Sequence, residues 1–182
     1  MNPPFSTIAV KEWIADNRAL FNPPYKTNRV LAHYNEFIVM VLAGPNARLD
    51  FHREAGEEFF QQIHGDIELH LKPEHGPRQI VKIREGEIFL CPAGLAHSPR
   101  RGECTWGLVI ERKRRPDELE QFLWFCENCD AQVLARSVGP AEAATEVRRI
   151  YQSFNADPAL RTCKMCGYIF PETPIADRLS FL

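Results

Sequence analysis

The segment GEIFLCPAGLAHSPRR, residues 86–101, decides the fold and raises the question of function. Its apolar run, residues 88–91, has the composition of a β-strand and meets a Pro-x-Gly turn. A single histidine, His97, follows three residues after Gly94. A lone histidine near a strand end is usually a satisfied polar residue, so the meaning of His97 depends on the rest of the chain.

Working outward, residues 29–111 consist of short β-rich runs separated by Gly, Pro and charged turns. In DIELHLK, residues 66–72, apolar and polar residues alternate strictly, which is the pattern of a half-buried strand. Many short strands without intervening helices predict an all-β barrel or sandwich. The runs lie at residues 36–44, 57–65, 66–72, 79–83, 87–92 and 105–112.

Two helices are predicted outside this β-rich region. Residues 7–21 carry apolar side chains at helical spacing, and the prolines of NPPY, residues 22–25, end the pattern. Residues 141–154, AEAATEVRRIYQSF, predict the second helix. We therefore expect an N-terminal helix and lead-in at residues 1–28, a barrel at 29–115 and a C-terminal extension at 116–182.

Charge and hydropathy argue against several classes of partner. The formal net charge of the 182 residues is −2, whereas a nucleic-acid-binding protein is expected to be more basic. No apolar run approaches the roughly 20 residues of a membrane span. The first residues lack the basic start and apolar core of a signal peptide. We expect a cytoplasmic protein that binds neither nucleic acid nor membrane.

Four of the six cysteines form the pattern C-x2-C-x33-C-x2-C. In a reducing compartment such spacing indicates a metal site rather than disulfides. Four thiolates in a tetrahedron suit zinc or iron. Because the second predicted helix lies between the two pairs, a metal would join the ends of the extension in a structural role. The expected ligands are Cys126, Cys129, Cys163 and Cys166.

A second block, GPNARLDFHREAGEEFFQQIHG at residues 44–65, supplies partners for His97. It offers His52, followed by Glu57 and Glu58, and adjacent strand residues face opposite sides. The two blocks resemble the signature motifs of the cupin superfamily, a small jelly-roll-like β-barrel, and the E-x6-G spacing of the first motif selects Glu58. Two imidazoles and one carboxylate form a facial triad that suits non-haem Fe(II) and leaves positions open for substrate and O2.

Nearly the whole chain is similar to the bacterial and fungal 3-hydroxyanthranilate 3,4-dioxygenase family of the kynurenine pathway. The resemblance implies a dioxygenase that opens the ring of a small aromatic aminophenol with O2. It also implies a product, 2-amino-3-carboxymuconate semialdehyde, that closes to quinolinate, no organic cofactor, iron as the bacterial choice at the cysteines, and a homodimer. The motifs that carry it are NPPYKTNR, GPNARLDFH, EEFFQQIHG, GEIFLCPAGLAHSPRR, LVIERKRRP, WFCENCD and RTCKMCG.

The resemblance also implies roles for four residues beyond the triad. Arg101 would pair with the substrate carboxylate, although Arg100 beside it is an alternative. Arg48 would stabilise negative charge developing on O2. Glu111 would accept a hydrogen bond from the substrate and assist proton transfer, and Asn28 would lie near the site.

The chain departs from the family pattern where RLDFH replaces the common R-T-D-Y-H. Leu49 and Phe51 remove two hydroxyls close to His52, and we expect them to reshape the pocket. Asp50 holds the place of a fourth cupin ligand and is interpreted as non-ligating. Two alternatives stay open: a related cupin dioxygenase acting on a substituted aminophenol or catechol, and a non-enzymatic ligand-binding cupin.

Overall fold

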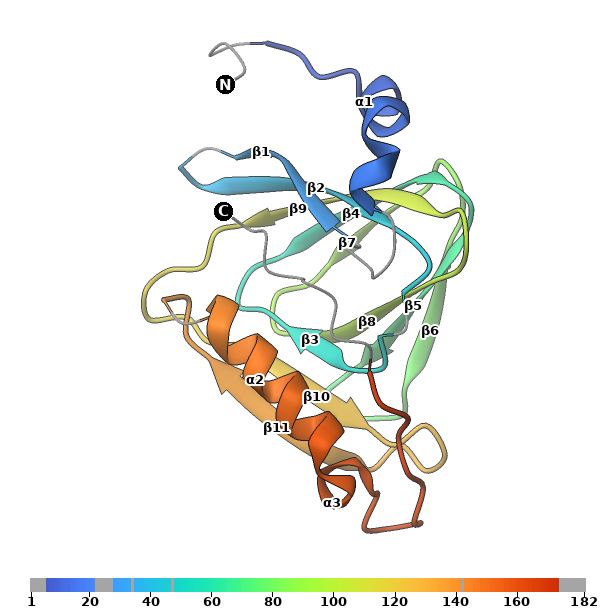
Figure 1. The fold of residues 1–182 in the computed structure, drawn as a ribbon, viewed down its shortest axis with the longest axis vertical. Coiled ribbons are helices and arrows are strands. Elements are labelled where there is room, and N and C mark those ends of the chain that lie inside the picture. Colours follow the sequence, from blue (N-terminus) through green and yellow to red (C-terminus); the bar gives the residue numbers. More distant parts are fainter. Residues whose placement is uncertain (1–5, 22–27, 34, 47, 142, 174–182) are drawn as a thin grey trace.

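The structure, a computed structural model, describes residues 6–21, 28–33, 35–46, 48–141 and 143–173 (Figure 1). Strands dominate the described residues, and helices lie near the two ends of the chain. In chain order the elements are α1 (Val10–Asn17), the 3-10 helix η1 (Arg18–Phe21), β1 (Asn28–His33), β2 (Phe37–Ala43), β3 (Phe51–Arg53), β4 (Glu58–His64), β5 (Ile67–Lys72), β6 (Gln79–Ile83), β7 (Ile88–Cys91), β8 (Ala96–Arg101), β9 (Trp106–Arg112), β10 (Glu120–Phe125), β11 (Gln132–Val138), α2 (Ala143–Ala156) and α3 (Pro158–Arg161).

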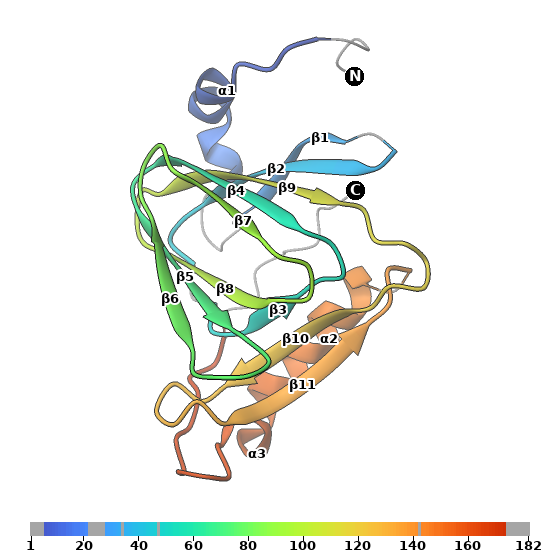
Figure 2. The same ribbon diagram turned by 180° about the vertical axis from the view of Figure 1, so that it is seen from behind.

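The strands of the described residues form two antiparallel sheets that face each other and enclose the barrel (Figures 1 and 2). One sheet has the strand order β1-β2-β9-β4-β7, and the other has the order β11-β10-β3-β8-β5-β6. The predicted all-β cupin barrel with its N-terminal and C-terminal helices is therefore confirmed. The six predicted runs correspond to β2, β4, β5, β6, β7 and β9.

The barrel interior holds an apolar cluster that borders the polar centre described below, since the Phe60 ring of this cluster meets the His97 ring edge to face. Alternate residues of β5 point inward, with Ile67, Leu69 and Leu71 all buried, as the strict alternation of this strand predicted. Met40, Phe60 and Val109 from the opposite sheet join the same cluster. The inward faces of the two sheets thus form a packed apolar core next to the functional residues.

The C-terminal extension continues the six-stranded sheet instead of forming a separate layer. β10 pairs with β3 on one side and with β11 on the other. α2 covers β10 and β11 (Figure 1), and the Trp124 ring stacks on Phe154 at a centroid distance of 4.6 Å. The division of the chain at residue 115 stays a prediction, and the structure shows that both sides of it share one sheet.

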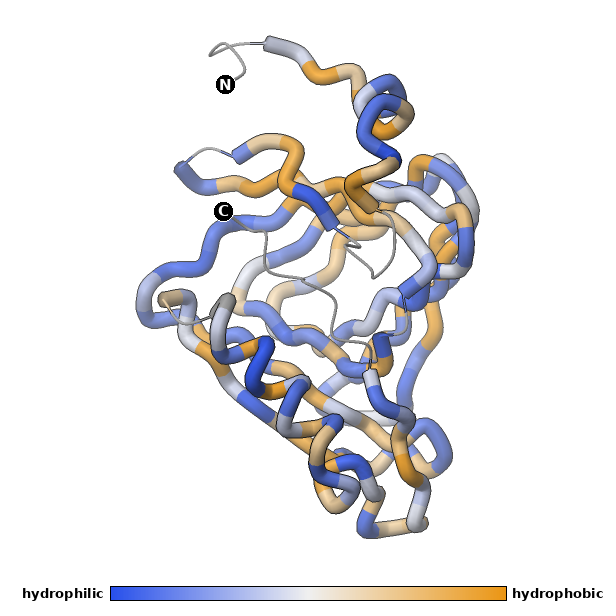
Figure 3. The backbone as a smooth tube through the Cα atoms, viewed as in Figure 1, coloured by the Kyte–Doolittle hydropathy of each residue, from blue (hydrophilic) through white to orange (hydrophobic). Residues whose placement is uncertain are grey.

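The N-terminal helix packs against the outside of the five-stranded sheet. Ile14 of α1 is buried with Val41 and Leu108, and the Trp13 and Trp106 rings border this contact. Hydrophobic residues concentrate on these strands in Figure 3, whereas the loop between β9 and β10 is hydrophilic. None of the helices in the described part of the chain has the length and apolar character needed to cross a membrane.

Candidate functional site

Three predicted metal ligands converge inside the barrel because two lie on the adjacent strands β3 and β8 and the third lies on β4 of the facing sheet. His52 on β3 is the direct partner of His97 on β8. Glu58 begins β4 and is buried, whereas Glu57 is exposed, so strand alternation selects Glu58 as the sequence predicted. One ligand atom from each of His52, Glu58 and His97 lies within 4.8 Å of the others.

His97 is held in an orientation that leaves one ring nitrogen for a ligand. Its Nδ1 lies 3.0 Å from the carbonyl oxygen of Leu95 and 3.5 Å from Sγ of the buried Cys91. Its Nε2 lies 3.0 Å from Oε1 of Glu58, and this oxygen has no hydrogen-bond partner among the described residues. A buried oxygen of this kind beside an oriented imidazole is typical of a metal site.

The protonation state of Glu58 also suits a metal. Burial opposes ionisation of this carboxyl group, but the neighbouring His97, His52 and Arg48 outweigh burial and lower its pKa to about 2. Glu58 is therefore a carboxylate at neutral pH, with a negative charge available to a cation.

A second set of residues, which the sequence did not predict, surrounds His52. Its Nε2 lies 2.7 Å from Oε2 of Glu120 and 3.2 Å from Oε1 of Glu54. Arg114 contacts Glu54 and lies 2.9 Å from Glu120. The ring of Phe122 stacks on the His52 ring at a centroid distance of 5.0 Å. Two of these four residues, Glu120 and Phe122, come from β10 of the C-terminal extension.

Negative charge is in excess at this centre. Glu54, Glu58 and Glu111 lie within 4.8 Å of one another, and Glu120 joins Glu54 around His52. Arg114 is the cation that contacts three of these four carboxyl groups. Arg114 and the nearby Arg48 are fewer than these four buried acidic groups, so the centre is suited to a divalent cation and to a proton.

Glu111 is the carboxyl group of this centre whose pKa is raised. It lies directly opposite Glu58 in the pairing of β4 with β9, and it is buried. Burial, together with the nearby Glu54 and Glu58, raises the pKa of Glu111 well above its ordinary value. A protonated carboxyl group beside the metal ligands can donate a hydrogen bond or pass on a proton.

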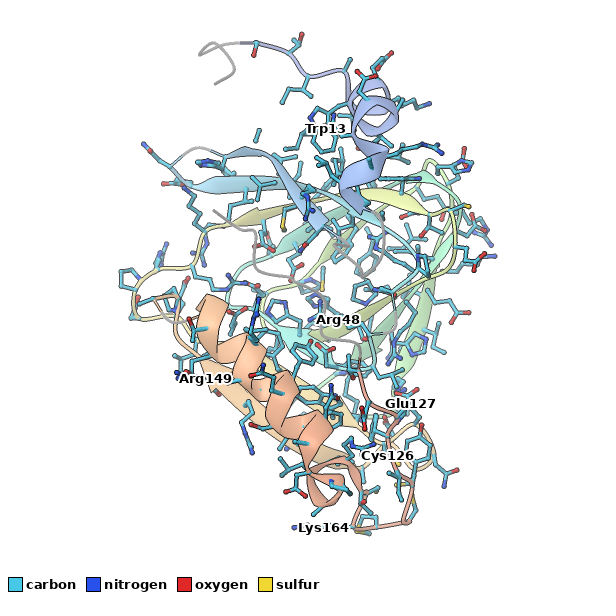
Figure 4. All side chains as sticks on the ribbon, in the orientation of Figure 1. Trp13, Arg48, Cys126, Glu127, Arg149 and Lys164 are labelled. Atoms are coloured by element: carbon cyan, nitrogen blue, oxygen red, sulfur yellow. The ribbon has the colours of Figure 1, made fainter. Side chains whose placement is uncertain are left out.

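Arg48 lies in the interior between the two sheets (Figure 4), close to the centre but engaged with Asp50. Its Nε donates to Oδ2 of Asp50 at 2.8 Å, and Nη2 lies at the same distance from that oxygen. Burial would lower the pKa of Arg48, but Asp50 and Glu58 outweigh burial and raise it. Arg48 is thus a permanent cation, and Asp50 is its ion-pair partner in this arrangement.

Arg101 occupies the interior, whereas Arg100 does not. His97, Pro99 and Arg101 share the inward face of β8, and the Arg101 side chain is buried. Its Nη1 donates to Oε1 of the buried Gln62 at 3.1 Å, and its Nε has no hydrogen-bond partner among the described residues. Burial lowers the pKa of Arg101 to about 10. The geometry resolves the alternative in favour of Arg101 as the inward-facing arginine.

The two residues that depart from the family pattern lie outside the barrel interior. Phe51 is fully buried next to His52 in sequence but on the opposite face of β3, where its ring meets Phe125 edge to face at 5.3 Å. Leu49 packs against the cluster formed by β10, β11 and α2. Strand alternation directs Phe51 away from the interior, so the described contacts do not support the expectation that Leu49 and Phe51 reshape the pocket.

Asn28 is the predicted site residue that the structure does not bring to the centre. It begins β1, where it pairs with Leu42. Contacts among the described residues do not connect its side chain to His52, Glu58 or His97. Its role near the site stays a prediction.

The four predicted cysteines meet at the far end of the extension, where Figure 4 labels Cys126. Sγ of Cys126 lies 3.5 Å from Sγ of Cys166, and Sγ of Cys129 lies 3.6 Å from Sγ of Cys163. The backbone N–H of Tyr168 donates to Cys166 and lowers its thiol pKa to about 6. Four converging sulfurs within 4.8 Å, one of them readily ionised, can hold a tetrahedral metal ion.

Comparison with known proteins relates the whole chain to one family. The family model described as 3-hydroxyanthranilic acid dioxygenase matches residues 4–155. A protein named 3-hydroxyanthranilate 3,4-dioxygenase from Bacillus cereus is 41% identical over 172 residues, which cover 94% of this chain and 96% of that protein. The proteins of the same name from Xanthomonas euvesicatoria and Neurospora crassa are 36% and 34% identical, covering 90% and 93% of this chain and 92% of each relative.

Solved structures were compared as well. A cupin-2 domain protein from Shewanella frigidimarina has a TM-score of 0.45 and 21% identity, covering 54% of this chain and 91% of that chain.

Proposed function

The chain belongs to the 3-hydroxyanthranilic acid dioxygenase family, and on that premise we propose that it cleaves 3-hydroxyanthranilate with O2. The product would be 2-amino-3-carboxymuconate semialdehyde, which closes to quinolinate. Both oxygen atoms of O2 enter the product and the substrate supplies all the electrons, so no organic cofactor is required. The observation that carries this proposal is the buried Arg101 guanidinium on the same strand face as His97.

His52, Glu58 and His97 would hold Fe(II). Two imidazoles and one carboxylate are the donor set of non-haem iron oxygenases. The fit rests on the Glu58 oxygen that lacks a hydrogen bond, on the oriented His97 ring, and on the excess of buried carboxylates. When bound, the iron would supply binding positions for O2 and for the substrate's hydroxyl and amine.

Arg101 would bind the substrate carboxylate. A guanidinium presents donors in a planar fork that matches a carboxylate, and charge-assisted hydrogen bonds of this kind are strong in a dry site. Among the described residues, no acidic side chain lies within ion-pair distance of Arg101, so its positive charge is available to a ligand. An anion bound there would also reverse the lowering of the Arg101 pKa that burial causes.

The remaining charged groups would act on the reacting atoms. Arg48 carries a permanent positive charge near Glu58 and would stabilise negative charge that develops on oxygen. Glu111 would exchange a hydrogen bond and a proton with the substrate's hydroxyl or amine, as its raised pKa allows. Glu54, Glu120 and Arg114 would hold the His52 side of the centre.

We extend the proposal to three further properties. Cys126, Cys129, Cys163 and Cys166 would hold iron or zinc in a structural role, because their sulfurs already converge. The enzyme would work in the cytoplasm, and it would be a homodimer, as the family resemblance implies.

The test is anaerobic reconstitution of the metal-stripped full chain with Fe(II). 3-Hydroxyanthranilate is added, O2 is admitted, and oxygen uptake and semialdehyde are followed for the wild type and for His97→Ala. Uptake matched one to one by product in the wild type, and lost in the variant, is expected. Stoichiometric iron in the barrel without turnover would overturn the substrate assignment and direct attention to related aminophenols and catechols.

A further inference from the structure

The side chain of Gln62 has no role in the reaction proposed above, yet it contacts the proposed carboxylate-binding residue. Glu58, Phe60 and Gln62 alternate along the inward face of β4, from the metal end of the barrel to Arg101. Gln62 is 1% exposed. A glutamine buried to this degree requires partners for both of its amide atoms.

Both partners are present, and together they fix which way the amide points. The backbone pairing of β4 with β9 shifts register between Gln62 and His64, so an irregularity lies at this position. The Gln62 Nε2 donates to the carbonyl oxygen of His64 at 2.9 Å. Oε1 is therefore the atom directed at Arg101, whose Nη1 donates to it at 3.1 Å.

The neighbouring strand leaves space for this contact. Gly107 on β9 pairs directly with Gln62. A Cβ at Gly107 would lie 2.9 Å from Oε1 of Gln62 and 3.0 Å from Nη1 of Arg101. The side-chain-free position therefore accommodates the glutamine and the guanidinium side by side.

We propose that Gln62 is a positioning residue for Arg101 and thereby sets the selectivity of the enzyme for aminophenols that carry a carboxylate. A neutral amide orients the guanidinium without neutralising its charge, so the cation stays available to an anionic ligand. Orientation before binding removes an ordering cost from the binding step. This inference rests on the proposed function, because it assumes that Arg101 receives the substrate carboxylate.

Hydrogen bonds also fix the backbone of Arg101. The orientation of its guanidinium is then what remains to be set. The Arg101 N–H donates to Oδ1 of Asn46 at 2.8 Å, and the Asn46 N–H donates to the Arg101 carbonyl at 3.0 Å. The Asn46 side chain also donates to the Pro99 carbonyl. Gln62 then holds the guanidinium end of the Arg101 side chain.

The experiment compares two probes that differ in the carboxylate alone, 3-hydroxyanthranilate and 2-aminophenol. Their dissociation constants are measured anaerobically on the Fe(II)-loaded full chain for the wild type, Gln62→Leu and Gln62→Glu. The matched control is Gln61→Leu, since Gln61 lies next in sequence on the exposed face of β4. Iron content and circular dichroism report whether each variant keeps its fold.

We expect Gln62→Leu to weaken 3-hydroxyanthranilate binding about tenfold, the scale of a lost hydrogen bond to a charged group, and to leave 2-aminophenol binding unchanged. Gln62→Glu places a carboxylate on Arg101 and should reduce the selectivity further, and it decides the question if Gln62→Leu does not fold. Equal losses for both probes, or unchanged selectivity in both variants, would overturn the positioning role alone. A wild type that shows no preference for the carboxylated probe would overturn the Arg101 assignment, and this inference with it.

Discussion

Replacing Arg114 by glutamine should expose how much of the centre's stability depends on charge compensation. Arg114 contacts Glu54, lies 2.9 Å from Glu120 and reaches Glu111 at 4.0 Å. The Glu54 and Glu120 side chains are only 3% and 4% exposed. Neither carboxylate can therefore turn to water when the guanidinium is removed.

The expected cost follows from this burial. Removing one partner of a buried ion pair typically destabilises a protein by about 3–5 kcal/mol, because the other charge stays buried and unpaired. For a chain of this length, about 3 kcal/mol corresponds to a fall in melting temperature of roughly 6–12 °C. Protonation of the stranded carboxyl groups limits the loss, so the lower end of the range is expected.

The pH dependence has a definite sign. Burial raises the pKa of Glu120, but the His52 contact and Arg114 outweigh burial and lower it below the ordinary value. A carboxyl group with a lowered folded-state pKa stabilises the fold above its unfolded pKa, about 4.3, and loses that contribution as pH falls. The difference between wild type and Arg114→Gln should therefore be present near pH 7 and shrink as the pH falls below about 4, towards the lowered pKa of Glu120.

Thermal unfolding of the full chain, with and without Fe(II) under anaerobic conditions, measures the effect. Arg112→Gln is the matched control, because Arg112 pairs with the more accessible Glu118 at 2.8 Å, and an ion pair nearer the surface contributes less to stability than a buried one. Added iron should recover part of the loss in Arg114→Gln, since the divalent cation takes over charge compensation. If Arg114→Gln lost no more than Arg112→Gln, the charge argument for this centre would be refuted.

Three other changes test neighbouring parts of the structure. Glu120→Gln should weaken Fe(II) binding in the barrel about 10–100-fold, the scale for partners of metal-binding histidines, and an anaerobic metal titration would show an unchanged affinity if Glu120 had no such role. Cys163→Ser removes one of four converging sulfurs, so it should release the second metal and loosen α2 and β11. Metal analysis and hydrogen exchange would detect both effects. Retained metal together with retained hydrogen-exchange protection would argue against a structural site. Trp124→Ala removes a fully buried ring stacked on Phe154 and should cost about 3–5 kcal/mol in urea unfolding, and a loss below 1 kcal/mol would contradict the packing of the extension.

The sequence predicted β5 from its alternating side chains and missed β8 and β3, which also carry candidate site residues. β8 carries His97, Pro99 and Arg101 on its inward face, so it lacks the apolar alternation that marks β5. β3 has three residues, and one of them is His52. The polar residues that make these strands functional also interrupt the apolar alternation by which a strand is predicted.

The proposed metal ligands could be predicted because they lie in two short segments that resemble the cupin motifs. The residues that hold His52 could not. Glu120 lies 68 positions from His52, and Arg114 lies 60 positions from Glu54. Such contacts depend on which strand of the extension pairs with β3, and that pairing has no local sequence pattern. Gln62 was missed for a related reason, because its partner Arg101 lies on the facing sheet 39 positions away.

The C-terminal extension therefore supplies contacts that the barrel needs, and residues 1–115 alone would lack them. A chain that ended there would lose β10, which is one of the two partner strands of β3. The buried cluster of Phe51 and Ala96 would lose Leu123 and Phe125. His52 would lose both the carboxylate of Glu120 and the ring of Phe122.

Each of these losses removes apolar burial or a buried polar contact at the centre of the six-stranded sheet, and β3 would become an unpaired edge. We expect residues 1–115 to be insoluble or unfolded, and the full chain with all four cysteines to be required for iron binding in the barrel. Expression of both forms, followed by circular dichroism and iron titration, separates the possibilities. A soluble fragment that bound one Fe(II) with the affinity of the full chain would show that the extension is an appendage, and that the contacts of β10 with His52 are incidental.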